Sequence, residues 1–220
     1  MFLNRDEAGR RLAERLTERL RAEPPADPVV LALPRGGLPV AAPVAAALGA
    51  PLDFVNVRKI GAPQDPELGL GAVVGGGGER PVTVLDERLI RLLRVAPGYL
   101  AAEERRQLAE IERRAAHYRE GRPAIPIAGR TVIVVDDGIA TGGTLRAALR
   151  ALRRHGPARL IVAVPVAPPD VLAGLADAAD GIVCLESPAD FGAVGAHYVD
   201  FDQVSDAEAI AILRHAARRS

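Results

Sequence analysis

The sequence contains few of the residues on which several protein classes depend. It has one cysteine, Cys184, no tryptophan, and only 3% aromatic residues. A single cysteine excludes a disulfide framework and a multi-cysteine metal site, and it fits a reducing compartment. Lysine is equally scarce: of the 28 basic residues only Lys59 is not an arginine. Codon bias is the simplest explanation of that imbalance.

The chain also lacks an excess of charge of either sign, and it lacks long apolar runs. Acidic and basic residues balance at 28 each, so the net charge offers no attraction to nucleic acid or to an anionic membrane. The longest uncharged run, 36–52, is shorter than a membrane span and contains three prolines. The N-terminus turns charged at once, without the core of a signal peptide. We therefore expect a globular, cytoplasmic protein with no membrane and no nucleic-acid partner.

Apolar periodicity divides the chain into helices and strands. Asn4 and Glu7 form an N-cap pattern, and an apolar residue every fourth position then predicts a helix that ends at Pro24. Continuous apolar runs typical of buried parallel strands occur at 29–33, 52–57, 70–74, 131–135, 159–166 and 181–185. Further helices are predicted at 37–48, where Pro43 implies a kink or a late start, and at 86–93, 97–118, 144–155, 169–176 and 206–218.

This alternation predicts an α/β fold, a three-layer doubly wound sheet with mainly parallel strands. One segment, 59–130, is too long to be a simple crossover between strands. Segments of this kind usually serve as lids or interaction elements.

The most informative stretch joins the strand 131–135 to the helix after it. The strand leads into two acids, Asp136 and Asp137, and Thr141–Thr144 (Thr-Gly-Gly-Thr) opens the helix. A helix N-terminus with glycines and hydroxyls suits a phosphate. The carboxylates would repel a phosphate, but they suit sugar hydroxyls or a divalent metal. The ligand implied has sugar hydroxyls close to a phosphate.

This stretch resembles the phosphoribosyl-pyrophosphate (PRPP) signature of type I phosphoribosyltransferases. The resemblance implies that Asp136 and Asp137 hold the ribose 2- and 3-hydroxyls in catalysis. It implies that the 5-phosphate is bound by the loop of Ala140, Thr141, Gly142, Gly143 and Thr144. It further implies a sheet order of 3-2-1-4-5-6 with strand 3 antiparallel, in which the loops after strands 1 and 4 meet at the switch point where open sheets bind ligands.

Two more segments fit this family. Arg35, Gly36 and Gly37 follow the first strand, where the family binds pyrophosphate through backbone N–H groups, often beside a cis peptide bond. Arg58 and Lys59 follow the second strand, where similar pairs lie beside the pyrophosphate ahead of a mobile loop, and Lys59 is the catalytic candidate. Without the other motifs, each segment is equally well an ordinary turn or a solvated pair.

The sequence gives fewer motifs for the part of the site that would bind the nucleobase. Hypoxanthine- and guanine-specific members carry an acid where this chain has Ala140, so a carboxylate proton acceptor is missing there. The family's acceptor pocket is formed by a variable hood, for which 186–202 is the candidate. Within it Asp190 could hydrogen-bond an exocyclic amine and Phe191 could stack on a flat ring, although core packing of Phe191 is equally compatible.

The resemblance covers about 29–185, and the order of segments also resembles a bacterial subgroup of stand-alone phosphoribosyltransferase-like proteins. It implies one domain over 1–220, with a lid and helical insertion at 59–130 and the hood at 186–202. The function implied is a phosphoribosyltransferase of nucleotide metabolism that moves ribose 5-phosphate from PRPP to a nitrogen acceptor of the nucleobase kind. Mg²⁺ enters with PRPP and not through a protein cage, and a homodimer is compatible.

Other functions remain open at this point. The chain could be a regulatory module that senses PRPP or a nucleotide with little turnover, or a phosphoryl-transfer enzyme that uses Asp136. The acids and glycines could also merely cap a helix and form a turn. A Walker A loop and a dinucleotide Gly-x-Gly-x-x-Gly pattern are both absent from the sequence.

Overall fold

A computed structural model describes residues 1–65, 68–76 and 79–219. The helices are α1 (Arg5–Leu20), α2 (Gly37–Leu48), α3 (Glu87–Leu92), α4 (Pro97–Arg119), α5 (Gly143–Arg153), α6 (Pro169–Ala173) and α7 (Asp206–Ala217), with a 3₁₀ helix η1 at Val194–His197. The strands are β1 (Pro28–Ala32), β2 (Leu52–Gly61), β3 (Gly69–Gly76), β4 (Glu79–Leu85), β5 (Thr131–Val135), β6 (Arg159–Val166) and β7 (Gly181–Glu186).

One seven-stranded sheet runs through the molecule in the order β4-β3-β2-β1-β5-β6-β7. The neighbours β2, β1, β5, β6 and β7 pair in parallel, whereas β3 pairs antiparallel with β2. The predicted α/β class and strand order are therefore confirmed. The sheet carries one strand more than expected, because β4 adds an antiparallel edge beside β3.

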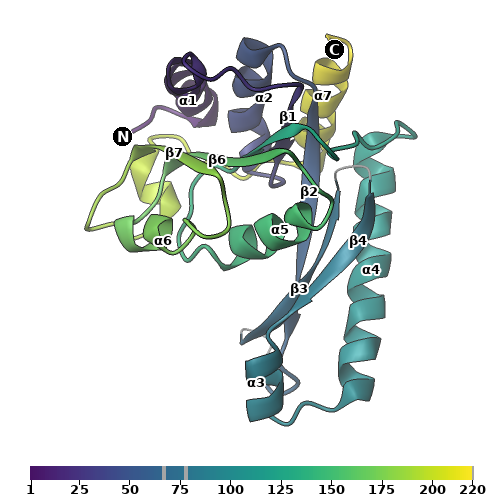
Figure 1. Cartoon of the computed structure of the whole chain (residues 1–220). Coiled ribbons are helices and arrows are strands. Elements are labelled where there is room, and N and C mark those ends of the chain that lie inside the picture. The colour runs from purple at the N-terminus through teal and green to yellow at the C-terminus, as the bar shows by residue number, and fades with distance from the viewer. Residues whose placement is uncertain (66–67, 77–78, 220) are drawn as a thin grey trace.

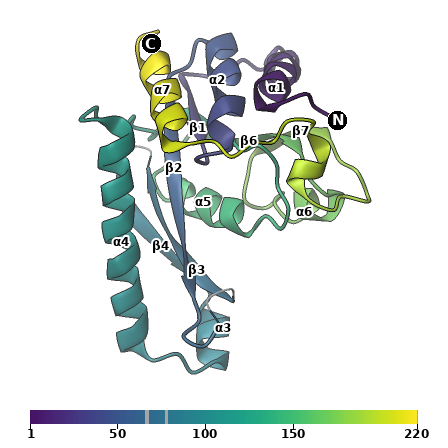
Figure 2. The ribbon, with the colours of Figure 1, turned by 180° about the vertical axis from the view of Figure 1, so that it is seen from behind.

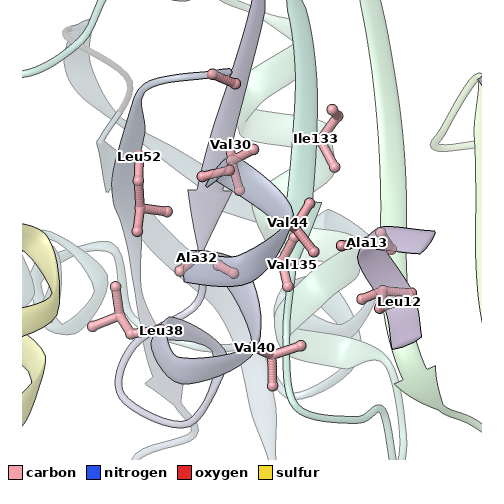
Figure 3. Close-up of a cluster of buried hydrophobic side chains, with 14 of the residues drawn as sticks. Leu12, Ala13, Val30, Ala32, Leu38, Val40, Val44, Leu52, Ile133 and Val135 are labelled. Carbon is pink, nitrogen blue, oxygen red and sulfur yellow. The ribbon is translucent and has the colours of Figure 1, made fainter. Parts of the chain in front are cut away.

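Helices cover both faces of the sheet. Helices α1, α2 and α7 lie on one face, and α5 and α6 lie on the other (Figures 1 and 2). Leu12 of α1 and Val44 of α2 pack with Val30, Ile133 and Val135 of the central strands, all fully buried (Figure 3). A second buried cluster joins α5 to the opposite face. These two apolar layers hold the strand ends, and the loops after them, in place.

The structure differs from the sequence prediction in the region after β1. Helix α2 starts at Gly37 and continues through Pro43, so the late start considered for this helix is wrong. Strand β2 runs on to Gly61, which places Arg58 and Lys59 inside the strand and not after it. The strand is longer than its apolar run because β3 supplies a partner along it, with Lys59 opposite Ala72. Two residues of the glycine stretch, 77–78, lie outside the described residues.

Much of the segment 59–130 extends the sheet away from its centre. Strands β3 and β4 lengthen one side, and α4 packs along β2 and β3 (Figure 1). Helix α3 lies at the far end of this extension. Helix α4 therefore runs along this extension of the sheet, and it also contacts α7.

Candidate functional site

Two loops from neighbouring parallel strands form the centre of the site. Ala32 at the end of β1 pairs with Val135 at the end of β5, and the Leu33 N–H donates to the Val135 carbonyl at 2.9 Å. The chain turns to opposite sides of the sheet after these two strands. Open α/β sheets bind ligands at such a switch point.

The glycines of the first loop allow the two loops to touch. A Cβ atom on Gly36 would overlap the Asp137 carboxylate, and one on Gly37 would lie 2.8 Å from the Val135 carbonyl oxygen. The peptide bond between Pro34 and Arg35 is cis, as the family resemblance suggests. Segments about a hundred residues apart in the sequence therefore meet at one point.

The two acids at the end of β5 have different surroundings. The Asp136 carboxylate accepts a hydrogen bond from the Asp137 N–H at 2.9 Å. Burial raises the pKa of Asp136 well above the usual range for aspartate, and the Asp137 charge raises it further. Asp137 is also desolvated, which raises its pKa, while the guanidinium of Arg5 opposes that rise. Two carboxylates therefore lie close together at this site. Both can be ionised at once only where positively charged or hydrogen-bonding partners compensate for burial and for their mutual repulsion.

Arg5 and Tyr198 surround Asp137 from outside the sheet. The Arg5 Nε lies 2.8 Å from the Asp137 Oδ2, and both side chains are largely buried. The Tyr198 hydroxyl donates to the Asp137 carbonyl at 2.6 Å. Neither residue is among the site residues predicted from the sequence. Arg5 is one of many arginines on helices, and no local pattern marks its distant partner.

The predicted phosphate loop lies at the start of α5. Gly142 adopts a left-handed conformation with φ of 74° as the N-cap, and α5 begins at Gly143. A side chain at Gly142 would also press on Val171, which fits the need for glycine there. Thr141, Gly143 and Thr144 are exposed, and the first turn holds no acid. Unpaired N–H groups at this exposed helix end can receive an anion.

The side chains of Arg58 and Lys59 point in different directions, because successive side chains of a strand point to opposite faces of the sheet. The Arg58 Nε donates to the Gln107 Oε1 of α4 at 2.9 Å. Lys59 instead lines a cavity of about 650 Å³ together with Thr141 and Thr144 of the phosphate loop. Helix α5 packs beside β2 and β3 at this cavity (Figure 1). Lys59 is thus grouped with the phosphate loop, and Arg58 with α4.

The Arg35 side chain lies beside the start of α7. Its Nη1 is 3.5 Å from the Asp206 Oδ1 at the start of α7, and the pair is partly exposed. Asp206 also accepts a hydrogen bond from the Tyr118 hydroxyl at 2.7 Å. Only the backbone of the Arg35–Gly37 turn, and not the arginine side chain, therefore lies against the acid pair.

The candidate hood packs next to Asp137. Asp190 is exposed, whereas Phe191 is half-buried against a small apolar cluster that includes Phe2 and Tyr198. The His197 ring lies 5.0 Å from the Phe191 ring, and its Nε2 is 2.9 Å from the Phe191 carbonyl oxygen. Phe191 is therefore a packed residue of this apolar cluster, whereas Asp190 remains accessible.

The described residues hold no group of three histidine, cysteine, aspartate or glutamate side chains able to bind a metal. At the acid pair only two carboxylates are available, and Arg5 occupies one oxygen of Asp137. The residues that the structure describes therefore do not form a magnesium cage. No helix among them is long and apolar enough to cross a membrane.

Comparison with known proteins adds independent observations. Residues 3–195 match the model of the phosphoribosyl transferase domain family. Two Mycobacterium tuberculosis proteins, each named "Putative phosphoribosyl transferase", are 47% identical over 218 residues, covering 99% of this chain and 47% of theirs. The chain thus spans about half the length of these curated relatives. The crystal structure of TT1426 from Thermus thermophilus is 46% identical with a TM-score of 0.83, and the match covers 98% of both chains.

Proposed function

Because the chain belongs to the phosphoribosyl transferase domain family, we propose that it transfers ribose 5-phosphate from Mg-PRPP to a nitrogen acceptor of the nucleobase kind. The observation that carries this proposal is the contact between Gly36 and the Asp137 carboxylate. It joins a glycine turn with backbone donors to the acid pair and the phosphate loop. A ligand with a pyrophosphate, ribose hydroxyls and a 5-phosphate presents groups complementary to all three.

Each part of the site has a role in this reaction. Asp136 and Asp137 accept hydrogen bonds from the ribose 2- and 3-hydroxyls, and the N-terminus of α5 binds the 5-phosphate. Backbone N–H groups at Gly36 and Gly37 bind the pyrophosphate. Lys59 adds positive charge on the cavity side of the phosphate loop. In this proposal magnesium enters bound to the pyrophosphate group of PRPP.

The reaction requires no covalent bond to the protein. The acceptor nitrogen forms a bond to C1 of the ribose and releases its proton to solvent, while the bond from C1 to the pyrophosphate oxygen breaks. Pyrophosphate leaves with the electron pair of that bond, and the ribose carries oxocarbenium character in between. The site contributes by holding the sugar and both phosphate groups in one geometry and by stabilising the departing charge.

Isothermal titration calorimetry with Mg-PRPP tests the proposal. We expect the wild-type chain to bind in the micromolar to millimolar range. Asp136→Ala and Asp137→Ala should each weaken binding at least tenfold, because each removes an acceptor for a ribose hydroxyl, equivalent to about 1.4 kcal/mol. Glu18→Ala, which removes an exposed acid that pairs with Arg15 on α1, is the control. Absence of binding by the wild type, or unchanged binding by both site variants, contradicts the proposal.

One observation favours a second function for the same site. Ala140 supplies no acid beside the expected position of the base, and Arg5 already engages Asp137. A PRPP-sensing module with little turnover would need neither an acid nor a free carboxylate. Measuring pyrophosphate release with a panel of nucleobases and amines separates the two: turnover with any acceptor supports the enzyme, and binding without turnover supports the sensor.

A further inference from the structure

Arg5 makes three contacts at the candidate site, although it is the first residue of α1. Its Nε lies 2.8 Å from the Asp137 Oδ2, and its Nη1 donates to the Asp202 carbonyl at 2.7 Å. Its guanidinium carbon lies 3.8 Å from the centre of the Phe201 ring. The side chain is only 12% exposed. One arginine therefore joins α1, the acid pair and the C-terminal end of the candidate hood.

The local helix does not explain an arginine at this position. A helix N-terminus carries partial positive charge, so a cation in the first turn is unfavourable. Arg10 and Arg15 of the same helix form exposed pairs with Asp6 and Glu18, about one turn away. Arg5 instead reaches a partner 132 residues further along the chain. Its contacts at the site offset the unfavourable location.

Arg5 also determines which oxygen of Asp137 can meet a ligand. Oδ2 accepts the hydrogen bond from Arg5 and faces the Gly36 backbone. Among the described residues, Arg5 is the side chain that bonds the Asp137 carboxylate, and it does so at Oδ2, which leaves Oδ1 for a ligand. The Arg5 guanidinium is itself held by Phe201 and by the Asp202 carbonyl, so it restricts the rotation of the carboxylate.

We propose that Arg5 is a positioning residue that holds Asp137 with Oδ1 directed at a ribose hydroxyl. This inference rests on the proposed function, because it assigns the ribose to Asp137. The N-terminus of α1 then becomes a part of the sugar-binding machinery, and Phe201 supports it from the far side. Loss of Arg5 frees the carboxylate to rotate and weakens recognition of the hydroxyl more than it weakens recognition of the phosphate.

Calorimetry with ribose 5-phosphate and its 2-deoxy and 3-deoxy analogues tests this role. Wild type should bind ribose 5-phosphate more tightly than either analogue. Arg5→Gln should bind ribose 5-phosphate about tenfold more weakly and lose its discrimination against at least one analogue. Arg5→Lys should recover part of that discrimination, because it restores the charge without the planar fork. Arg10→Gln removes an exposed ion pair of the same helix and should match wild type.

The outcomes separate this inference from the function on which it rests. If wild type binds neither ribose 5-phosphate nor Mg-PRPP, the proposed function itself is contradicted, and the role of Arg5 falls with it. If wild type discriminates and Arg5→Gln discriminates equally well, the function stands and the role of Arg5 is wrong. A purely structural role would lower the melting temperature without changing the ratio of affinities. If Arg5→Gln does not fold, the ratio measured with Arg5→Lys decides: an unchanged ratio overturns the proposal, and a reduced one supports it.

Discussion

The surroundings of Asp136 disfavour its ionised form. Burial and the neighbouring Asp137 raise its folded pKa above the unfolded value, which is about 3.9. For an acid shifted in this direction, the destabilisation is fully present above the folded pKa. It disappears as pH falls to the unfolded pKa. Asp136, for which we propose a role in ribose binding, thus reduces stability at neutral pH.

Asp136→Asn should therefore stabilise the free protein at pH 7 while it weakens PRPP binding. The amide oxygen can still accept the hydrogen bond from the Asp137 N–H. The gain in the free energy of unfolding is about 1.4 kcal/mol for each unit by which the folded pKa exceeds the unfolded one. Urea unfolding from pH 4 to pH 8 measures it, and the gain should shrink toward the acid end.

The exposed Asp190 supplies the control for this prediction, since Asp190→Asn should change stability by less than about 0.5 kcal/mol. An Asp136→Asn protein that is less stable than wild type at every pH would show that the buried charge is fully compensated.

At the scale of elements, α4 is attached to the sheet through buried polar groups. Arg119 at its C-terminal end lies 3.0 Å from the Asp53 Oδ2 of β2, and both side chains are largely buried. Asp53 also accepts hydrogen bonds from the Phe54 and Ile125 N–H groups. Further along, the Gln107 side chain binds Arg58 of β2. These bonds hold the helix beside the strand that carries Lys59.

Asp53→Ala should destabilise the protein by about 3–5 kcal/mol, because it leaves the buried Arg119 and two N–H groups without their acceptor. Glu18→Ala, which breaks an exposed pair with Arg15 on α1, should cost less than about 1 kcal/mol. Chemical denaturation of both variants measures the difference. Equal small losses would mean that water replaces the Asp53 bonds at no cost.

At the scale of the whole molecule, the N-terminal segment packs against the end of the candidate hood beside the site. Phe2 is fully buried, and its ring lies 5.4 Å from the ring of Tyr198. The Phe2 N–H donates to the His197 carbonyl at 2.7 Å. Tyr198 in turn binds the backbone of Asp137. Contacts between the N-terminal segment and Tyr198 thus support the acid pair.

Phe2→Ala should cost about 3–5 kcal/mol of stability, the usual loss for a buried phenylalanine. The neighbouring Leu3 is exposed, so Leu3→Ala should cost less than about 0.5 kcal/mol. Unfolding followed by tyrosine fluorescence and by circular dichroism measures both losses. A small loss in Phe2→Ala would mean that the N-terminal segment is not part of the cooperative unit.

Most elements and the residues that make up the central loops could be recognised before the fold was known. Strands β1, β5 and β6 are visible as apolar runs, since strands buried on both faces require continuous hydrophobicity. Asp136, Asp137 and Thr141–Thr144 lie close together in sequence, so their combination is a local pattern. The order of the parallel strands followed from the family resemblance of those loops.

Which distant groups meet depends instead on tertiary packing. Strand β4 and the end of β2 require pairing with β3, and no apolar pattern indicates such a partner. The pleat of β2 sends Arg58 to α4 and Lys59 to the cavity, although the two are neighbours in sequence. The ion pair between Arg5 and Asp137 exists because packing of α1 on the sheet brings them together. Local sequence encodes backbone preference and side-chain type, whereas proximity across 132 residues arises only when the whole chain packs.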